Sequence, residues 1–335
     1  MSDSEANPDT ASNDAAAKKT AGGTKAATPK LKAAKPDGRL RKILKRILPK
    51  KFFERHPIVA VIKMTGTIAS GSSSFKQNLS ISSTAETLER AFSLKGAEAV
   101  AILMNSPGGS PVQSTLIFKR IRALAEEKEL PVIVFCEDVA ASGGYLIALA
   151  GDEIYADKSS IIGSIGVISA GFGFVDAIDK LGIQRRVYTS GEKKMSLDPF
   201  SKENNQDIKR LKAIQSQIHD VFKNMVSDRR GDKIAGREDE LFTGEFWAGE
   251  AAVERGLIDG IADVRGLMRE RYGDKVKLKV VGGEKSWFMR RFSKTGLPTG
   301  ASLERLANDS GFSQNLVEGG LSALETRALW SRFGL

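Results

Sequence analysis

The sequence contains few of the residues on which common hydrolytic and metal-dependent sites are built. Its 335 residues include one cysteine and two histidines. A single cysteine excludes an intrachain disulfide, and Cys136 lies in an apolar run, which predicts a buried structural thiol. His56 and His219 lie outside any Gly/Ser-rich turn, and we expect both to be surface or helix-face residues. No zinc-binding helix, phosphate loop or Gly-x-Ser-x-Gly elbow occurs, so neither a metal nor a cofactor is expected.

Long apolar runs are also missing. No uninterrupted stretch of about 18–20 apolar residues predicts a transmembrane helix. The N-terminus lacks the charged start and apolar stretch of a secretory signal. We therefore expect a protein of the cytoplasm, or one bound peripherally to the cytoplasmic face of the inner membrane.

The net charge of +10 is concentrated at one end of the chain. Residues 1–56 hold 14 basic and six acidic residues, a surplus of eight, whereas the rest holds 37 basic and 35 acidic residues. The globular part is thus nearly neutral, while a nucleic-acid-binding core would carry basic stripes on its own surface. No nucleic-acid partner is expected.

Composition divides the chain into four segments. Residues 1–38 are low in complexity, and we expect them to be disordered. Residues 39–56 should form a basic amphipathic helix, and its stretch 39–53 should contact an anionic membrane surface. The alternative is a helix packed on the domain or on a neighbouring subunit. Residues 57–270 form the globular domain, and residues 271–335 form a C-terminal extension.

Within the domain, strands alternate with helices, which predicts an α/β fold. The expected strands cover residues 58–64, 99–104, 131–136, 153–156, 161–168 and 185–188. The expected helices cover residues 85–92, 111–127, 142–150, 175–181 and 203–229, and a turn and a helix lie within 242–261.

Two Gly-rich turns follow apolar strands, where ligand sites of α/β folds tend to collect. The first is Asn-Ser-Pro-Gly-Gly-Ser (105–110), and the second is Ala-Ala-Ser-Gly-Gly-Tyr (140–145). In the second turn, Ser142 stands where a helix begins, and free N–H groups there favour an anion. A nucleophilic serine needs such donors for the oxyanion of acyl transfer. Each turn alone is explained equally well as a plain strand–helix junction.

A serine nucleophile also needs a base, and without a suitable histidine the candidates are Lys, Asp and Glu. Lys194 is followed by Met195 and Leu197, so it is better placed for burial than most basic residues of the chain. Burial can lower a lysine pKa by roughly 3–5 units, enough to leave the amine neutral near pH 7. The alternative is a solvated loop lysine.

An ordered set of motifs resembles the signal peptide peptidase A (protease IV) family, including its SohB-like branch, within the Clp-protease/crotonase superfamily. The matching segments are residues 105–109, 140–145, 162–167, 190–194, 242–244 and 252–259. The resemblance covers roughly residues 57–270. It implies a spiral of ββα units, assembly into homo-oligomeric rings, and peptide substrates such as signal-peptide remnants or misfolded protein.

The resemblance also implies roles for individual residues. Ser142 matches the family's nucleophile, and Lys194 matches its general base, with Lys193 as the alternative if the alignment slips by one. Ser164 matches a serine that orients the lysine. Gly109 and Gly143 match the backbone donors of the oxyanion hole. In this family the lysine and the serine can come from neighbouring subunits.

Three other functions compete with a Ser/Lys endopeptidase. A crotonase-like acyl-CoA hydratase or isomerase would use the oxyanion glycines with carboxylates and would need no serine. A His-dependent Clp-type peptidase is disfavoured, because no histidine lies between residues 57 and 218. An inactive membrane-associated scaffold would not need the intact Ser/Lys/Gly set. Family members commonly carry an N-terminal membrane or signal segment, where this chain has its low-complexity leader and basic helix.

Overall fold

The computed structural model describes residues 56–71, 78–191, 193–282 and 327–334. These residues belong to one compact unit that begins at His56. The leader expected over residues 1–38 and the amphipathic helix expected over residues 39–56 lie outside the described residues. Most of the expected C-terminal extension lies outside them as well.

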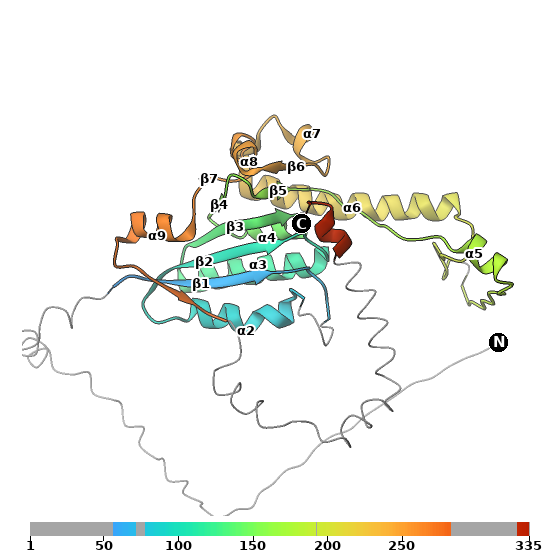
Figure 1. The fold of residues 1–335 in the computed structure, drawn as a ribbon, viewed down its shortest axis with the longest axis horizontal. Helices are drawn as coiled ribbons and strands as arrows, with labels where there is room; N and C mark the ends of the chain where they lie inside the picture. Colours follow the sequence, from blue (N-terminus) through green and yellow to red (C-terminus); the bar gives the residue numbers. More distant parts are fainter. Residues whose placement is uncertain (1–55, 72–77, 192, 283–326, 335) are drawn as a thin grey trace, which may run out of the picture. The chain divides into compact units, whose positions relative to one another are not determined.

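The centre of the fold is a mostly parallel sheet (Figure 1). Its order is β6-β5-β3-β2-β1-β8. The bounds are β1 Ile58–Thr65, β2 Ala97–Ser106, β3 Val132–Ala141, β5 Ile161–Gly163, β6 Phe246–Ala248 and β8 Lys277–Val280. Only the β5–β6 pair among these neighbours is antiparallel.

One edge of β3 is shared by two strands. Residues 133–136 of β3 pair with β4 (Glu153–Ala156), and residues 139–141 pair with β5. The sheet therefore forks, with β7 (Gly260–Ile261) continuing one branch beside β4 and β6 continuing the other beside β5. The α/β fold expected from the sequence is confirmed.

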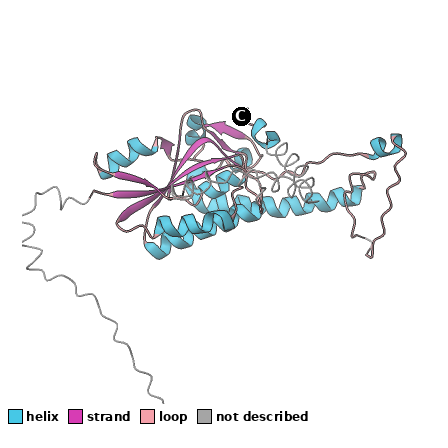
Figure 2. Ribbon diagram, turned by 60° about the horizontal axis from the view of Figure 1, so that its bottom comes forward, coloured by secondary structure: helices cyan, strands magenta, loops and turns pink. Residues whose placement is uncertain are grey.

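Helices cover both faces of the sheet (Figures 1 and 2). On one face, α2 (Ile81–Phe92), α3 (Pro111–Lys128) and α4 (Gly143–Ala148) pack over alternate residues of β1, β2 and β3 and form the main core. On the other face, α9 (Val264–Tyr272) buries Met268 against Val61, Ala101 and Phe135. Strands β2 and β3 are apolar on both sides, as expected of strands covered on both faces.

A long helix and an extended arm project from the sheet (Figures 1 and 2). The helix is α6 (Asn205–Arg230), and the arm, defined here as residues 168–204, carries the short helix α5 (Val175–Lys180). The two halves of the arm meet where Arg185 Nε donates to Asp198 at 2.9 Å. Residues 185–188 are not a strand, because within the described residues no neighbouring strand pairs with them.

The remaining short elements complete the region after α6. They are a 3-10 helix at Gly231–Ile234, α7 (Glu238–Leu241) and α8 (Gly249–Glu254). Within the part of the chain that the structure describes, no helix combines the length and hydropathy needed to span a membrane.

The fold continues beyond residue 270, where we expected the domain to end. Strand β8 pairs in parallel with β1 over residues 58–61. Near the C-terminus, Phe333 is buried against Val139 and Ala141 of β3, and its ring meets Phe246 edge-on with centroids 5.1 Å apart. The sequence Lys-Leu-Lys-Val of β8 is short and half charged, so its pattern alone does not predict a strand of the sheet.

Candidate active site

Ser142 lies in a sharp turn between β3 and α4. Its backbone has φ 52° and ψ −123°, a conformation that side chains rarely adopt. This turn resembles in shape the strained strand-to-helix elbow that exposes the nucleophile of α/β-hydrolases, although the Gly-x-Ser-x-Gly sequence is absent. The N–H of Ser142 donates to the carbonyl of Gly163 at 2.8 Å, which fixes the turn to β5.

Glycine is required on all sides of this turn. A Cβ on Gly108 would lie 2.8 Å from Cβ of Ser142, and one on Gly144 would lie 2.5 Å from the carbonyl oxygen of Ser106. A Cβ on Gly143 would lie 2.4 Å from Oγ of Ser114. The two Gly-rich turns noted in the sequence therefore pack directly against each other, and their glycines allow that approach.

The predicted oxyanion donors, Gly109 and Gly143, lie side by side. A Cβ built on Gly143 would be 3.4 Å from the backbone nitrogen of Gly109. Among the hydrogen bonds of the described residues, none uses the N–H of either glycine, and Gly143 is the first residue of α4, where N–H groups have no partner in the helix. Both N–H groups are thus available to an anion next to Ser142.

Backbone hydrogen bonds to Ile68 hold the two residues on either side of Gly109. Ile68 accepts a hydrogen bond from the N–H of Ser110 at 2.7 Å and donates its own N–H to the carbonyl of Gly108 at 2.9 Å. A Cβ on Gly109 would lie only 2.1 Å from the carbonyl oxygen of Ile68. Sequence patterns did not identify this support, because it depends on chain segments about 40 residues apart.

Ser164 lies one residue beyond Gly163 and is therefore held near Ser142. Its side chain is buried, and its backbone also has a positive φ of 53°. Its N–H donates to the carbonyl of Glu245 at 2.6 Å. The structure thus brings together four of the five residues expected to form the site, namely Ser142, Ser164, Gly109 and Gly143.

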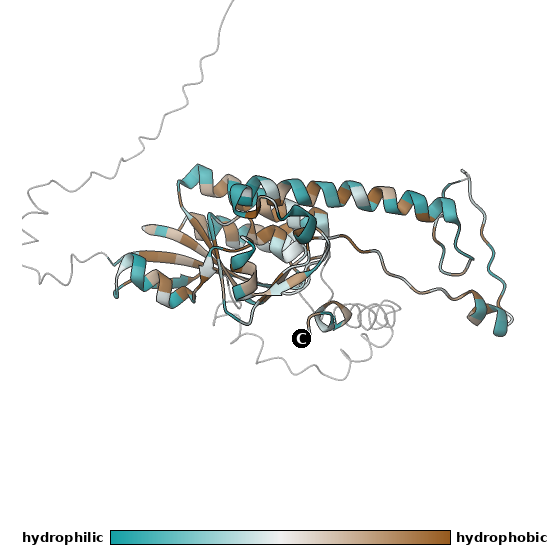
Figure 3. Cartoon of the chain, turned by 90° about the horizontal axis from the view of Figure 1, so that it is seen from above, coloured by the Kyte–Doolittle hydropathy of each residue, from teal (hydrophilic) through white to brown (hydrophobic). Residues whose placement is uncertain are grey.

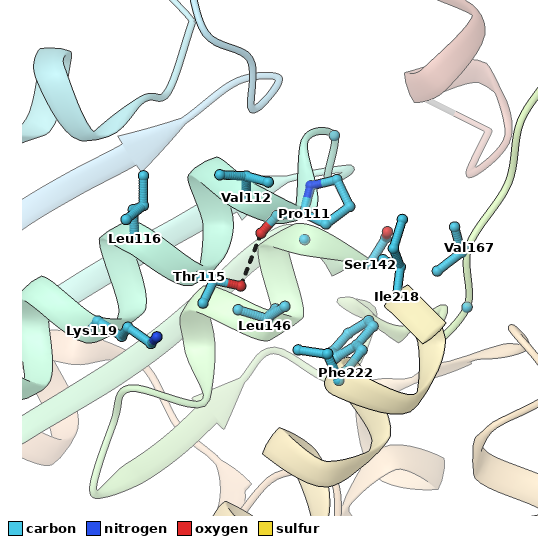
Figure 4. Close-up of a pocket in the computed structure, with 14 residues that line it drawn as sticks. Pro111, Val112, Thr115, Leu116, Lys119, Ser142, Leu146, Val167, Ile218 and Phe222 are labelled. Carbon is cyan, nitrogen blue, oxygen red and sulfur yellow. Dashed lines mark hydrogen bonds between the residues drawn. The ribbon is translucent and has the colours of Figure 1, made fainter. Parts of the chain in front are cut away.

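Beside Ser142 the chain forms an apolar pocket of about 430 Å³ (Figure 4). Its walls come from α3, α4, α6 and the segment that follows Ser164. The side chains that line it include Val112, Leu116, Leu146, Val167, Ile218 and Phe222. Lys119 is the charged residue among the described lining residues, and it lies two turns along α3 from Pro111. Such a pocket suits apolar groups of a ligand.

Lys194, the fifth expected residue, is not part of this pocket. Lys193 and Lys194 are both exposed on the arm. The N–H of Lys194 closes a turn by donating to the carbonyl of Gly191 at 3.1 Å. We expected Lys194 to be buried, but in the described part of a single chain it is exposed and lies outside the pocket that Ser142 lines.

The other nucleophilic and basic candidates, Cys136 and His219, have structural roles in the fold. Cys136 is buried, and desolvation raises the pKa of its thiol to about 12, which leaves it unreactive at neutral pH. His219 is partly buried on α6, and its Nε2 lies 3.1 Å from the carbonyl oxygen of Ile165. The expectation of a helix-face residue holds for His219, but sequence reasoning missed its contact with the residue next to Ser164.

Comparison with known proteins identifies the family. The sequence pattern of peptidase family S49 matches residues 124–277. A putative protease of Synechocystis sp. is 30% identical over 268 residues, which cover 77% of this chain and 89% of that relative. The chain is a member of peptidase family S49.

Two further relatives of this S49 chain are only partly covered. A putative signal peptide peptidase SppA of Enterococcus faecium is 34% identical over 168 residues, 50% of this chain and 48% of the relative. A Brucella abortus protein named Na(+)/H(+) antiporter NhaA is 48% identical over 293 residues, which cover 88% of this chain. The chain spans only 39% of that longer protein, whose name therefore describes more than the matched region.

Hydrogen bonds from two arginines hold the C-terminal end of α4, the helix that follows Ser142. At the C-terminal end of α4, Arg229 donates to the carbonyls of Leu149 and Gly151 at 2.9 and 2.7 Å, and Arg122 donates to Ala150 at 3.1 Å. Positive charge at this end of α4 interacts favourably with the negative end of the helix dipole.

Further along, α6 is locked by a buried ion pair. The guanidinium of Arg230 donates to both oxygens of Asp259, at 3.0 and 3.1 Å, and Lys233 adds a third bond at 2.5 Å. Tyr145, three residues after Ser142, donates its hydroxyl to the Leu257 carbonyl at 2.7 Å, and burial raises the pKa of that hydroxyl. The motif 252–259, which matched the family without an assigned role, therefore supports α4 and α6.

Proposed function

We propose that this chain is a serine endopeptidase with Ser142 as its nucleophile. The observation that carries the proposal is the strained turn at Ser142, which stands at an apolar pocket with two unengaged backbone N–H groups beside it. A strained backbone that persists is often part of a functional site. Family membership makes peptide-bond hydrolysis the reaction to test first.

In the proposed reaction, a neutral lysine accepts the proton of the Ser142 hydroxyl as Oγ attacks the peptide carbonyl. The N–H groups of Gly109 and Gly143 donate to the oxyanion of the tetrahedral intermediate. The lysine then gives its proton to the leaving amine, and an acyl-enzyme ester remains on Ser142. Water, deprotonated by the same lysine, hydrolyses the ester and frees the second product.

We propose that Lys194 supplies this base from the arm of a neighbouring copy, with Ser164 orienting it. The arm exposes large apolar side chains that a lone chain leaves in water, including Phe172, Leu181 and Tyr188 at 82, 73 and 91% exposure. Figure 3, coloured by hydropathy, shows apolar stretches along the arm. Burial of these side chains against a second copy would favour a homo-oligomer, such as a ring. The same contact would desolvate Lys194 and lower its pKa.

The proposed substrates are unfolded or apolar peptides, such as signal-peptide remnants, or membrane-associated and misfolded polypeptides. The apolar lining of the pocket supports this class, because it offers few polar groups to a hydrophilic side chain. An extended, apolar and unfolded segment fits such a site better than a folded surface.

The testing experiment measures turnover of a fluorogenic apolar peptide and of unfolded casein by four proteins. These are the wild type, Ser142→Ala, Lys194→Ala and Lys193→Ala. The proposal requires both Ser142→Ala and Lys194→Ala to lose turnover while remaining folded and assembled, with only a mild effect of Lys193→Ala. Full activity of Ser142→Ala would remove the nucleophile assignment, and loss only in Lys193→Ala would move the base by one residue.

Peripheral membrane contact through residues 39–53, on the cytoplasmic face, is a separate proposal based on sequence. Within residues 39–48, five basic residues surround five aliphatic ones with no acidic residue among them. A variant lacking residues 1–56 should no longer co-sediment with anionic vesicles. Unchanged co-sedimentation would place the contact elsewhere.

A further inference from the structure

His219, the second histidine of the chain, contacts a residue of the site but does not line the pocket. His219 lies on α6, and its Nε2 is 3.1 Å from the carbonyl oxygen of Ile165, 54 residues earlier in the sequence. A carbonyl oxygen can only accept, so Nε2 is the donor and carries the proton. Its neighbours on α6, Ile218 and Phe222, line the pocket, while the imidazole is directed to the backbone.

Ile165 is the middle of a segment whose conformation decides the shape of the site. Residues 163–167 begin at Gly163, the last residue of β5, and include Ser164. Gly166 and Val167 form one wall of the pocket. Beyond Gly163 the segment has left the sheet, so no strand ladder holds it. Its position therefore depends on single hydrogen bonds and on the burial of the Ile165 side chain in the main core.

Three such bonds hold three successive residues, and each comes from a different part of the fold. Ser142 donates its N–H to the carbonyl of Gly163 at 2.8 Å. Ser164 donates its N–H to the carbonyl of Glu245 at 2.6 Å. His219 donates to the carbonyl of Ile165, and this is the bond closest along the chain to Gly166 and Val167.

We propose that His219 is a positioning residue of the peptidase site, which acts through the Ile165 carbonyl on Ser164 and on the pocket wall. The inference rests on the proposed function. Its side chain fastens α6 to the segment 163–167 at a point where no other described bond does so. His219 does not act as the general base, because its Nε2 carries a proton and donates it to the Ile165 carbonyl.

The chemistry of the bond gives a rescue test. His219→Ala removes the donor, whereas His219→Gln keeps a side-chain N–H₂ that can reach the same carbonyl. We expect His219→Ala to lower kcat/KM for the apolar peptide about tenfold, and His219→Gln to recover most of that loss. His56→Ala is the matched control, because it removes the other histidine, which lies before β1 and far from residue 165 in the sequence.

Hydrogen exchange supplies a second measurement that does not depend on activity. Amides of residues 161–168 should exchange faster in His219→Ala than in the wild type, and at nearly the wild-type rate in His219→Gln, while thermal unfolding and assembly stay unchanged. The wild type and Ser142→Ala are assayed alongside. Equal turnover by these two would refute the proposed function, yet the exchange result would still decide the role of His219.

Two outcomes would overturn the inference about His219. If His219→Ala matches the wild type in both kcat/KM and exchange, the bond to Ile165 has no positioning role. If His219→Gln is as impaired as His219→Ala in turnover but exchanges normally, the imidazole acts by its own chemistry and the positioning role is wrong.

Discussion

The N–H of Ser142 donates to the carbonyl of Gly163 at 2.8 Å, so the backbone of Ser142 is fixed by the residue that precedes Ser164. Two sequence motifs about 20 residues apart are thereby joined into one site. The pairing of Ala141 with Gly163 extends the contact between β3 and β5 up to the turn. Any displacement of β5 would therefore move both serines together.

The strained backbone of Ser142 predicts a difference between two inactive variants. Both Ser142→Gly and Ser142→Ala lack the hydroxyl, but only glycine adopts φ 52°, ψ −123° without strain. Strain of this kind costs on the order of 1–3 kcal/mol, part of which is offset by the greater chain entropy of unfolded glycine. Ser142→Gly should be more stable than Ser142→Ala by about 1 kcal/mol in denaturant unfolding. Equal stabilities would show that the turn is unstrained.

Gly143→Ala should damage catalysis more than folding. The added methyl group would lie 3.4 Å from the nitrogen of Gly109, beside both proposed oxyanion donors, and it would meet the movable Oγ of Ser114. Loss of one oxyanion donor typically lowers kcat by about 10²–10³-fold. Gly171→Ala is the control, because a Cβ there meets nothing within 4 Å. A Gly143→Ala enzyme with normal kcat would show that a methyl group beside the two donors does not disturb them, which contradicts their proposed place at the reacting carbonyl.

The Arg230–Asp259 pair should contribute strongly to stability. The side chains of Arg230 and Asp259 are only 3 and 12% exposed, and breaking such a buried pair costs about 3–5 kcal/mol. Asp259→Asn should therefore lower the free energy of unfolding at pH 7 by about 3 kcal/mol. The control is Glu250→Gln in the exposed pair with Lys158, which should change stability by less than about 0.5 kcal/mol.

The same pair predicts a pH dependence of stability. Burial opposes ionisation of Asp259, but the hydrogen bonds from Arg230 and Lys233 outweigh it and hold the pKa of Asp259 below its ordinary value of 3.8. A carboxyl whose pKa is lower in the folded state stabilises the fold above its unfolded pKa, and this contribution disappears as the pH falls through the folded pKa. The stability gap between the wild type and Asp259→Asn should shrink below about pH 4. A gap that is constant from pH 7 to pH 3 would contradict this assignment.

The C-terminal segment of residues 327–334 should stabilise the strands that carry the site. Phe333 is 7% exposed and packs on Ala141, next to Ser142, and on Phe246 of β6. Phe333→Ala should reduce the free energy of unfolding by about 2 kcal/mol, the transfer free energy of one buried aromatic side chain. Arg327→Ala, at an exposed position of the same terminal segment, should have little effect. Identical melting of both variants would mean that residues 327–334 do not support the sheet.

Local patterns were sufficient to predict most of the fold. The apolar runs of β1, β2 and β3 and the proline-initiated helix α3 appeared at or near their expected positions. Ser142, Ser164, Gly109 and Gly143 were also found together, because each follows an apolar strand that ends at the same edge of the sheet. An apolar strand that is followed by a Gly/Ser-rich turn can be recognised from the sequence alone.

Other features depend on contacts that no local pattern reveals. The expected strand 161–168 ends at Gly163, since the residues beyond it bond to Glu245 and His219 instead of a strand. Residues 185–188 have strand-like composition, yet they lie exposed in the arm. Lys194 is exposed on the arm, and the residues that line the pocket beside Ser142 do not include it. In the proposed arrangement its partner lies on a second copy, which neither its sequence neighbours nor the isolated fold reveals.

The most direct test of the account is complementation between two inactive variants. Ser142→Ala chains keep Lys194, and Lys194→Ala chains keep Ser142, so a mixed oligomer regenerates complete sites only if the two residues come from different copies. Random equal mixing of differently tagged chains should restore about a quarter of the wild-type sites across a head-to-tail interface. We predict that the purified mixed oligomer hydrolyses the apolar peptide at about that fraction of the wild-type rate. A mixed oligomer that forms and stays as inactive as its parents would contradict a serine and a lysine shared between neighbouring chains.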